Sequence, residues 1–419
     1  MKRYFFTLIL ITISVFASAQ IVLSDSAKIT LLTCGPWSGA VYAFYGHTAL
    51  RVQDDSTRID VVFNYGFFDP TQSNFMYHFV RGETDYILGT TSFEEFIREY
   101  AYKKVAVYEQ ELNFAQPEKQ QLWEALYINH LPENRGYRYN YFYDNCATRP
   151  RDMVEKFAGG KIIYPPTKER QTYRDLLHEC LQPYPWNKFG IDLVIGAGAD
   201  SPIDVRAKMF IPSYLMNSFE QATVVKNDTV SYPLIGNTTA VLVSNEENNS
   251  SERALFSPLI AAFALLFITV LVSAVQYIKW NKTRLPRTYD TILFAVYGLG
   301  GCILFLLMFF SEHPATNPNW NFVWLNIFAL VAAVLFWVKP VKKAVNIYHF
   351  INFAVLTLFL LFWWWLPQQL PAASVPFSMS LWLRSGMNVF MLTKRRKTNK
   401  RYVSSKYMKA GWGQRYTLK

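Results

Sequence analysis

The chain has 419 residues, a formal net charge of +11 and 51% hydrophobic residues. The charge is unevenly distributed: residues 20–254 contain 22 Lys and Arg against 29 Asp and Glu, whereas the remainder contains 20 basic and two acidic residues. The basic excess lies mainly in the hydrophobic C-terminal half. It therefore indicates membrane orientation and argues against nucleic acid as a partner.

The first 19 residues have the pattern of a secretory signal peptide. Lys2 and Arg3 precede an apolar run over 4–16, and the small residues at 17–19 form a cleavage site. We predict that the domain after residue 19 is exported. The alternative, an uncleaved anchor, is disfavoured because the apolar run is short for a membrane span.

Residues 20–245 mix strand and helix patterns, which predicts an α+β domain. A helix over 92–103 is indicated by a capping box from Ser92 to Glu95, and a second helix over 116–131 has Pro117 in its first turn. A peripheral hairpin is expected after residue 229, before a polar linker at 246–253. Runs rich in β-branched and aromatic residues predict strands at 28–34, 47–53, 58–68 and 103–112.

Three of the four cysteines, Cys34, Cys146 and Cys180, lie in the predicted exported domain, and Cys302 lies in a hydrophobic run. An exported domain meets an oxidising compartment, and three thiols leave at least one unpaired. A disulfide between Cys34 and Cys180 would leave Cys146 free. Two buried thiols are the alternative.

Cys146 lies in the stretch YFYDNCATRPRD, residues 141–152. Asp144 or Asn145 can cap a following helix, and a thiol at a helix N-terminus has a lowered pKa. Arg149 adds nearby positive charge. Pro150 cannot donate to the carbonyl of Cys146, so the regular helix is expected to begin after the cysteine. Cys146 is therefore either a reactive nucleophile or a structural thiol.

A cysteine nucleophile requires a histidine base with an orienting partner. The exported domain has four histidines, of which His47 follows a glycine at the start of a strand pattern, where it can face a cleft. His78 lies among aromatic residues, His130 ends a helix, and His178 is expected at the surface of a short helix. The chain has no Cys-x-x-Cys or His-x-x-x-His spacing, so we predict no metal. The segment 194–200, VIGAGAD, has no βαβ context and predicts a turn.

The C-terminal half contains five hydrophobic runs that approach the length of a membrane span. Four are long and uncharged, and the fifth carries Arg384. The runs are 254–278, 291–310, 320–338, 344–366 and 374–392. They predict an all-helical membrane domain at 254–393.

The loops between these runs predict the topology. Basic residues follow the first, third and fifth runs, whereas the alternate loops SEHPATNPN and PQQLPAA contain no Lys or Arg. Because basic loops remain cytoplasmic, the N-terminal domain is expected outside and the basic tail, 394–419, inside. An odd number of spans agrees with an exported N-terminal domain.

Polar residues accompany the predicted outer face of the membrane domain. His313, Asn319 and Asn321 lie in one outer loop, and Arg384 lies inside a span. Charged groups within a bilayer are usually paired or functional. Two interpretations follow: Arg384 snorkels or pairs with a loop group, or these residues form a binding patch for lipid headgroups.

Several motifs together resemble the Lnb family of bacterial lipoprotein N-acyltransferases. The motifs are LLTCGPWSGAVYAFYGHTALRV, VFNYGFFD, YFYDNCATRPRD and SEHPATNPNWNFVWLN, and the resemblance extends from about Lys28 to Met391. It implies a periplasmic thiol domain of the permuted papain-like, NlpC/P60-like kind, joined to about five transmembrane helices in the bacterial inner membrane. The family usually has an aliphatic residue where this chain has Pro150.

The resemblance implies that Cys146 is the nucleophile, His47 the base and Asn64 the third catalytic residue. The acyl donor would be a phospholipid and the acceptor the α-amine of a diacylglyceryl lipoprotein, with no cofactor. Two alternatives remain from the residues alone: a membrane-bound cysteine peptidase or peptidoglycan amidase, and a non-enzymatic receptor. Residues assigned to substrate binding are His313, Asn319, Asn321, Arg384 and Arg149.

Overall fold

The structure is a computed structural model that describes residues 21–68, 74–167, 170–227, 230–244, 256–279 and 284–414. The predicted signal peptide and linker lie outside these residues. The chain divides into two compact units. We call them the sheet unit (Met1–Pro70, Asp85–Lys168 and Asp204–Glu246) and the helical unit (Thr71–Thr84, Glu169–Ile203 and Glu247–Lys419). The predicted linear boundary at residue 245 differs from this division, because two earlier segments group with the membrane helices.

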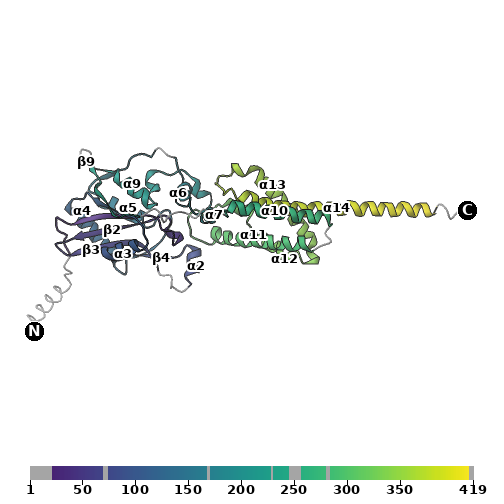
Figure 1. Ribbon diagram of the computed structural model, residues 1–419, viewed down its shortest axis with the longest axis horizontal. Helices are drawn as coiled ribbons and strands as arrows, with labels where there is room; N and C mark the ends of the chain where they lie inside the picture. The colour runs from purple at the N-terminus through teal and green to yellow at the C-terminus, as the bar shows by residue number, and fades with distance from the viewer. Residues whose placement is uncertain are drawn as a thin grey trace, which may run out of the picture. The chain divides into compact units, whose positions relative to one another are not determined.

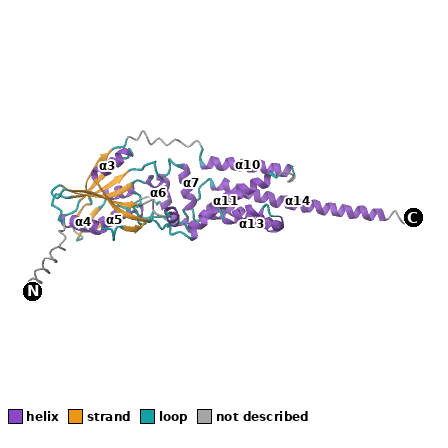
Figure 2. Cartoon of the chain, turned by 90° about the horizontal axis from the view of Figure 1, so that it is seen from below, coloured by secondary structure: helices purple, strands orange, loops and turns teal. Residues whose placement is uncertain are grey.

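The sheet unit is built on a seven-stranded antiparallel sheet with the order β10-β5-β1-β2-β3-β4-β6. Figure 2 shows the strands of this unit in orange. The strands are β1 (Lys28–Cys34), β2 (His47–Asp54), β3 (Ile59–Phe67), β4 (Asp85–Ser92), β5 (Val107–Leu112), β6 (Gly136–Arg138) and β10 (Ile235–Leu242). A second sheet contains β7 (Lys161–Ile163), β8 (Thr223–Lys226) and β9 (Val230–Pro233). The four predicted strands correspond to β1, β2, β3 and β5, and the α+β class is confirmed.

The central strands are covered on both faces. In β1, Ile29 and Leu31 belong to one buried cluster, whereas Leu32 and Cys34 belong to another. Successive strand residues point to opposite faces, so the continuous apolar run KITLLTC is explained by burial on both sides. This burial fixes the register in which Cys34 pairs with His47, and Ala49 with Asn64.

Helices cover the sheet where their capping signals predict them. The predicted capping box is confirmed, because Glu95 N–H donates to Ser92 Oγ at the start of α3. Pro117 lies in the first turn of α4, as predicted. The remaining helix of interest for the site, α5, follows Cys146. The helices of this unit are η1 (Val41–Ala43), α3 (Phe93–Tyr102), α4 (Gln116–His130), α5 (Thr148–Phe157), α8 (Val205–Lys208) and α9 (Pro212–Glu220).

The predicted hairpin after residue 229 is wrong. Its two strands, β9 and β10, are adjacent in sequence but belong to different sheets, since β9 pairs with β8 and β10 pairs with β5. Leu234 between them is fully buried and its N–H donates to Ala222 O. The chain therefore passes through the core here instead of folding back on itself.

Among the residues that the structure describes, the helical unit contains three helical segments long and apolar enough to cross a membrane: Pro258–Ile278, Leu285–Phe309 and Lys339–Trp365. Trp320–Leu335 is a shorter apolar helical stretch, and the fifth predicted run opens the long helix α14. The number of five spans therefore remains a prediction. The elements are α2 (Phe75–Arg81), α6 (Tyr173–Cys180), α7 (Pro185–Val194), η2 (Ala197–Asp200), α10 (Pro258–Ile278), α11 (Leu285–Phe309), η4 (Trp320–Val323), α12 (Ile327–Leu335), η5 (Lys339–Val341), α13 (Lys342–Phe362), η6 (Trp363–Trp365) and α14 (Ser374–Gln414) (Figure 1). The predicted turn at 194–200 corresponds to η2.

Helix α14 places polar residues inside the bundle. Ser378, Ser380 and Arg384 are fully buried, which is the reverse of a lipid-facing helix. Helices α11 and α12 approach closely at Gly298, where a Cβ atom would lie 2.2 Å from the backbone nitrogen of Leu330. Small residues permit such close helix contacts in membranes.

Candidate active site

His47 and Asn64 lie on neighbouring central strands and contact each other. His47 Nε2 is 3.3 Å from Asn64 Oδ1. The amide nitrogen of Asn64 donates to Val62 O at 3.4 Å and to Thr91 Oγ1 at 3.3 Å, so the amide oxygen is the atom that faces the imidazole. In this arrangement Nε2 carries the proton and donates to Asn64, which leaves Nδ1 as the basic nitrogen.

Cys146 lies on the turn immediately before α5. Asn145 caps this turn: its Oδ1 accepts from the N–H groups of Ala147 at 2.8 Å and Thr148 at 2.9 Å. The Asn145 amide in turn donates to Phe210 O at 2.9 Å, so the cap is anchored in the core. The helix begins at Thr148, after the cysteine, as predicted from Pro150. The sequence left open whether Asp144 or Asn145 is the cap, and the structure selects Asn145.

The Cys146 sulfur accepts hydrogen bonds from the backbone N–H of Thr48, from its own backbone N–H and from the Tyr139 hydroxyl. Thr48 is the chain neighbour of His47, so the thiol lies at the beginning of β2. Tyr139 is held in place by a stacked contact with Tyr86, with ring centroids 4.3 Å apart. Sequence reasoning missed Thr48 and Tyr139, because a strand threonine and one tyrosine in an aromatic-rich segment carry no distinguishing pattern.

Gly66 faces the cysteine from β3. Its φ of +106° is costly for any residue with a side chain, and a Cβ atom here would lie 3.8 Å from Cys146 Cβ. The register between β3 and β4 shifts at this point, which marks a β-bulge. The bulge brings the backbone of β3 against the thiol, and only glycine adopts this backbone conformation without strain.

The prediction that Cys146 has a lowered pKa is wrong. Burial raises the pKa of the thiol to about 11, and the three hydrogen bonds to the sulfur only partly offset this effect. Arg149 does not act on the thiol, because its guanidinium pairs with Asp144 at 2.5 and 2.8 Å and stacks on the Tyr137 ring. Burial also lowers the pKa of His47, so both groups are neutral near pH 7. A substrate-binding role for Arg149 remains a prediction.

All four cysteines carry free thiols. Cys34 is buried opposite His47 in the β1–β2 pair, and Cys180 ends α6 in the helical unit. The structure therefore corresponds to the alternative of two separate thiols and contains no Cys34–Cys180 disulfide.

Two family models match the chain and between them cover most of it. Residues 18–179 match the Lnb N-terminal periplasmic domain, and residues 248–396 match the Lnb transmembrane domain. The chain belongs to the Lnb family of lipoprotein N-acyltransferases. It is therefore an acyltransferase with a periplasmic N-terminal domain and a transmembrane domain. Searches of curated proteins and of solved structures found no match.

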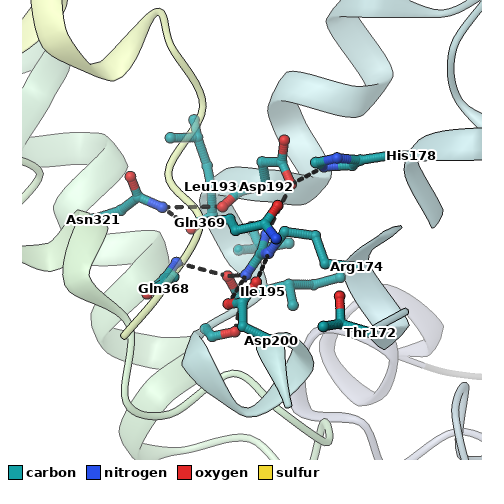
Figure 3. A network of polar contacts seen from close by, with 12 residues as sticks. Thr172, Arg174, His178, Asp192, Leu193, Ile195, Asp200, Asn321, Gln368 and Gln369 are labelled. Atoms are coloured by element: carbon teal, nitrogen blue, oxygen red, sulfur yellow. Dashed lines mark hydrogen bonds and ion pairs between the residues drawn. The ribbon is translucent and has the colours of Figure 1, made fainter. Parts of the chain in front are cut away.

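In this Lnb protein, the two asparagines predicted to bind substrate donate hydrogen bonds to the end of a helix. Asn319 Nδ2 donates to Leu193 O at 2.7 Å, and Asn321 Nδ2 donates to Asp192 O at 3.0 Å. These carbonyls belong to the last turn of α7, where helices leave backbone acceptors unsatisfied. Gln368 continues the cap by donating to Ile195 O at 3.0 Å (Figure 3). Both asparagines are buried, so this geometry supplies a structural reason for them, and their role in substrate binding remains a prediction.

A buried arginine lies at the centre of the same network. Arg174 is fully buried, and its guanidinium donates to Asp192 at 2.8 Å and to Asp200 at 2.7 Å (Figure 3). His178 Nε2 lies 2.8 Å from the same Asp192 oxygen. His178 is therefore partly buried and paired, although the sequence predicted it at the surface. The sequence offered no sign of Arg174, because one arginine in a short helix is normally solvated.

Arg384 does not belong to an outer-loop patch. Its guanidinium is fully buried and donates to Asp290 at 2.5 and 3.1 Å, to Ser273 at 2.8 Å and to Gln276 at 2.6 Å. Ser273 and Gln276 lie near the end of α10 and Asp290 near the start of α11, at the opposite end of α11 from His313. The interpretation that Arg384 pairs with a loop group or joins a headgroup patch is therefore corrected, because its partners are helix residues. His313 Nε2 lies 2.8 Å from Phe79 O.

Proposed function

We propose that this Lnb protein transfers an acyl chain from a phospholipid through a thioester on Cys146 to the α-amine of a diacylglyceryl lipoprotein. His47 accepts the Cys146 thiol proton while the sulfur attacks an ester carbonyl of the phospholipid. The carbon–oxygen bond then breaks, and the leaving lysophospholipid alkoxide takes the proton from His47. A thioester remains on the enzyme.

In the second half of the reaction, the neutral amine of the lipoprotein attacks the thioester carbonyl. The carbon–sulfur bond breaks, an amide forms, and His47 carries the surplus proton from the amine to the sulfur. Asn64 orients the imidazole in both halves. Atoms and charges balance without a metal or a cofactor.

One observation carries the proposal. The backbone N–H of Thr48 bonds the Cys146 sulfur, while the side chain of the preceding residue, His47, bonds Asn64. A thiol, an imidazole and a carboxamide thus lie together where the start of β2 pairs with the second half of β3. Two further donors are available to a developing oxyanion beside the sulfur, the Cys146 N–H and the Tyr139 hydroxyl.

The arrangement of loops supports an outer-leaflet site. The loop between α11 and η4 contains no Lys or Arg, whereas basic residues follow the end of α10 and lie within the C-terminal half of α14. In this topology the basic C-terminal tail is cytoplasmic, and the acyl donor comes from the periplasmic leaflet of the inner membrane.

Intact-mass measurement on purified protein incubated with phospholipid and no acceptor tests the thioester. The wild-type chain should gain the mass of one acyl group, which hydroxylamine removes. Cys146→Ser should show no hydroxylamine-sensitive adduct, whereas Cys180→Ser, a matched control, should behave as wild type. Addition of an apolipoprotein should then discharge the adduct into N-acylated product.

Either of two results would overturn the proposal. One is a wild-type enzyme that acylates lipoprotein while rapid-quench samples show no adduct, and the other is a fully active Cys146→Ser variant. Cleavage of a muropeptide without cleavage of lipid would favour the hydrolase instead.

A further inference from the structure

Helix α2 (Phe75–Arg81) presents apolar side chains to its surroundings. Tyr77 is 57% exposed, Phe79 46% and Val80 38%. Three neighbouring apolar side chains on one short helix leave a hydrophobic surface that water solvates poorly. The helix lies between β3 and β4 in sequence but belongs to the helical unit.

The C-terminal end of α2 is bound to the chain that follows α11. Glu312 N–H donates to Arg81 O at 2.7 Å, and His313 Nε2 lies 2.8 Å from Phe79 O. Gly82 ends α2 with a φ of +71°, and a Cβ atom there would lie 2.8 Å from the backbone nitrogen of His313. The contact therefore depends on a glycine, and it fixes α2 next to residues 312 and 313.

The lipid-facing surface of α11 ends next to this contact with α2. Exposed apolar residues recur along one face of this helix at spacings of three and four residues, as expected for a side that contacts acyl chains. They are Ile292, Val296, Leu299, Ile303 and Leu306, and the exposed C-cap residue Phe310 follows them. Because the periplasmic domain precedes α10, α11 runs back toward the periplasm when both helices cross the membrane. Phe310 then marks the outer boundary of the hydrocarbon, two residues before the contact with α2.

The charges of α2 are paired with Glu83, directly after the helix. Arg81 pairs with Glu83 at 2.6 Å and donates a hydrogen bond to the Tyr77 hydroxyl oxygen at 3.0 Å. His78 Nδ1 lies 3.5 Å from the same glutamate. A helix with exposed aromatic residues and paired charge is suited to the boundary between headgroups and acyl chains.

We propose that α2 is an interfacial helix whose Tyr77, Phe79 and Val80 side chains insert into the outer leaflet of the bilayer. Its partner is bulk phospholipid, with no requirement for a particular headgroup. The helix lies in the connection between β3, which carries Asn64, and β4. It is therefore joined through the chain itself to the strand that carries Asn64. This inference does not depend on the proposed thioester chemistry.

Fluorescence quenching in nanodiscs tests the insertion. The full chain, with its four native cysteines replaced by alanine and one new cysteine at Val80, is labelled with an environment-sensitive fluorophore. Its emission should shift to the blue and lose intensity in lipids brominated on their acyl chains, to an extent comparable with a label at Phe310. A label at Asp55, in the charged turn between β2 and β3, supplies the comparison for a polar surface site. The quenching should be the same in zwitterionic and anionic lipids.

A second measurement keeps the native cysteines. A photoreactive phenylalanine analogue at Tyr77 should crosslink to phospholipid in both the wild-type and Cys146→Ala backgrounds, which separates bulk lipid from lipid bound for catalysis. A Val80 label that iodide quenches as efficiently as the Asp55 label, with no effect of bromine, would overturn the proposal. So would a Tyr77 crosslink that forms only to protein.

Discussion

The pH dependence of Cys146 alkylation distinguishes two resting states of the thiol and imidazole. Burial raises the pKa of Cys146 to about 11 and lowers that of His47 below its ordinary 6.5. At pH 7 the pair is therefore a neutral thiol beside a neutral imidazole, and not a thiolate–imidazolium ion pair. Since the thiolate is the reacting species, the resting enzyme should resist alkylating reagents.

The size of the effect follows from the thiol pKa. Burial raises the pKa of the Cys146 thiol from the ordinary 9.0 to about 11. The thiolate fraction at neutral pH is then about 100-fold smaller than for an ordinary cysteine, because each pH unit changes it about tenfold. The alkylation rate should be lower by about the same factor and should rise about tenfold per pH unit up to roughly pH 10.

Iodoacetamide labelling followed by peptide mass spectrometry measures this rate at Cys146 alone. The reference is the same cysteine in denatured protein. His47→Ala should leave the alkylation profile almost unchanged, since a neutral imidazole does not stabilise the resting thiolate. It should nevertheless abolish acyl transfer, because the general base is lost. An apparent pKa near 7 that increases when His47 is replaced would refute this reasoning and would establish a resting ion pair.

Three further substitutions test the geometry. Asn64→Ala removes the hydrogen bond to His47, worth about 0.5–1.5 kcal/mol, and should lower kcat roughly 2- to 12-fold in a steady-state acyl-transfer assay with little change in KM. Arg384→Met leaves Asp290 buried without its partner, and should cost about 3–5 kcal/mol of stability, measured as a lower apparent Tm in detergent, with much of the loss recovered in the Arg384→Met/Asp290→Leu double variant. Gly66→Ala forces a side chain into a strained backbone conformation, and should cost about 1–3 kcal/mol in the same melting assay while also lowering kcat.

The two stability substitutions, at Gly66 and Arg384, have matched controls. Gly136→Ala places a methyl group where no atom lies within 4 Å, so it should be nearly neutral beside Gly66→Ala. Arg287→Met removes an exposed arginine of α11 and should change stability by about 0.5 kcal/mol or less. If Arg287→Met lowers the stability as much as Arg384→Met does, the buried Arg384–Asp290 pair contributes nothing specific to stability. An unaltered kcat in Asn64→Ala would remove Asn64 from the proposed machinery.

Local patterns predicted the elements that carry the proposed catalytic residues. The runs KITLLTC and HTALRVQ are strands because both of their faces are buried, and Ser92 and Glu95 cap a helix because their side chains satisfy its first backbone donors. Pro150 correctly indicated that the helix begins after Cys146. These predictions depend on interactions between residues close in sequence, which a single chain reveals directly.

The predictions that failed depend on contacts between distant segments. The pKa of Cys146 was expected to be low from its neighbours in sequence, but burial among other strands raises it. The substrate-binding role of Asn319 and Asn321 remains a prediction, but their structural role was also hidden from the sequence. Their partners are carbonyls of α7, about 130 positions away in sequence. No periodicity or motif encodes such a pairing.

A neutral resting pair suits an enzyme whose second substrate is an amine. The acceptor α-amine must lose its proton before it attacks, and such groups ordinarily titrate at about 7.7–8.0. His47, with its lowered pKa, is unprotonated at that pH and is ready to accept the proton released during attack. A histidine held as imidazolium beside a resting thiolate would have to lose its proton first. On this argument, the acid limb of thioester formation belongs to His47 and lies below pH 6.5, whereas the acid limb of transfer belongs to the acceptor amine and lies near its higher pKa.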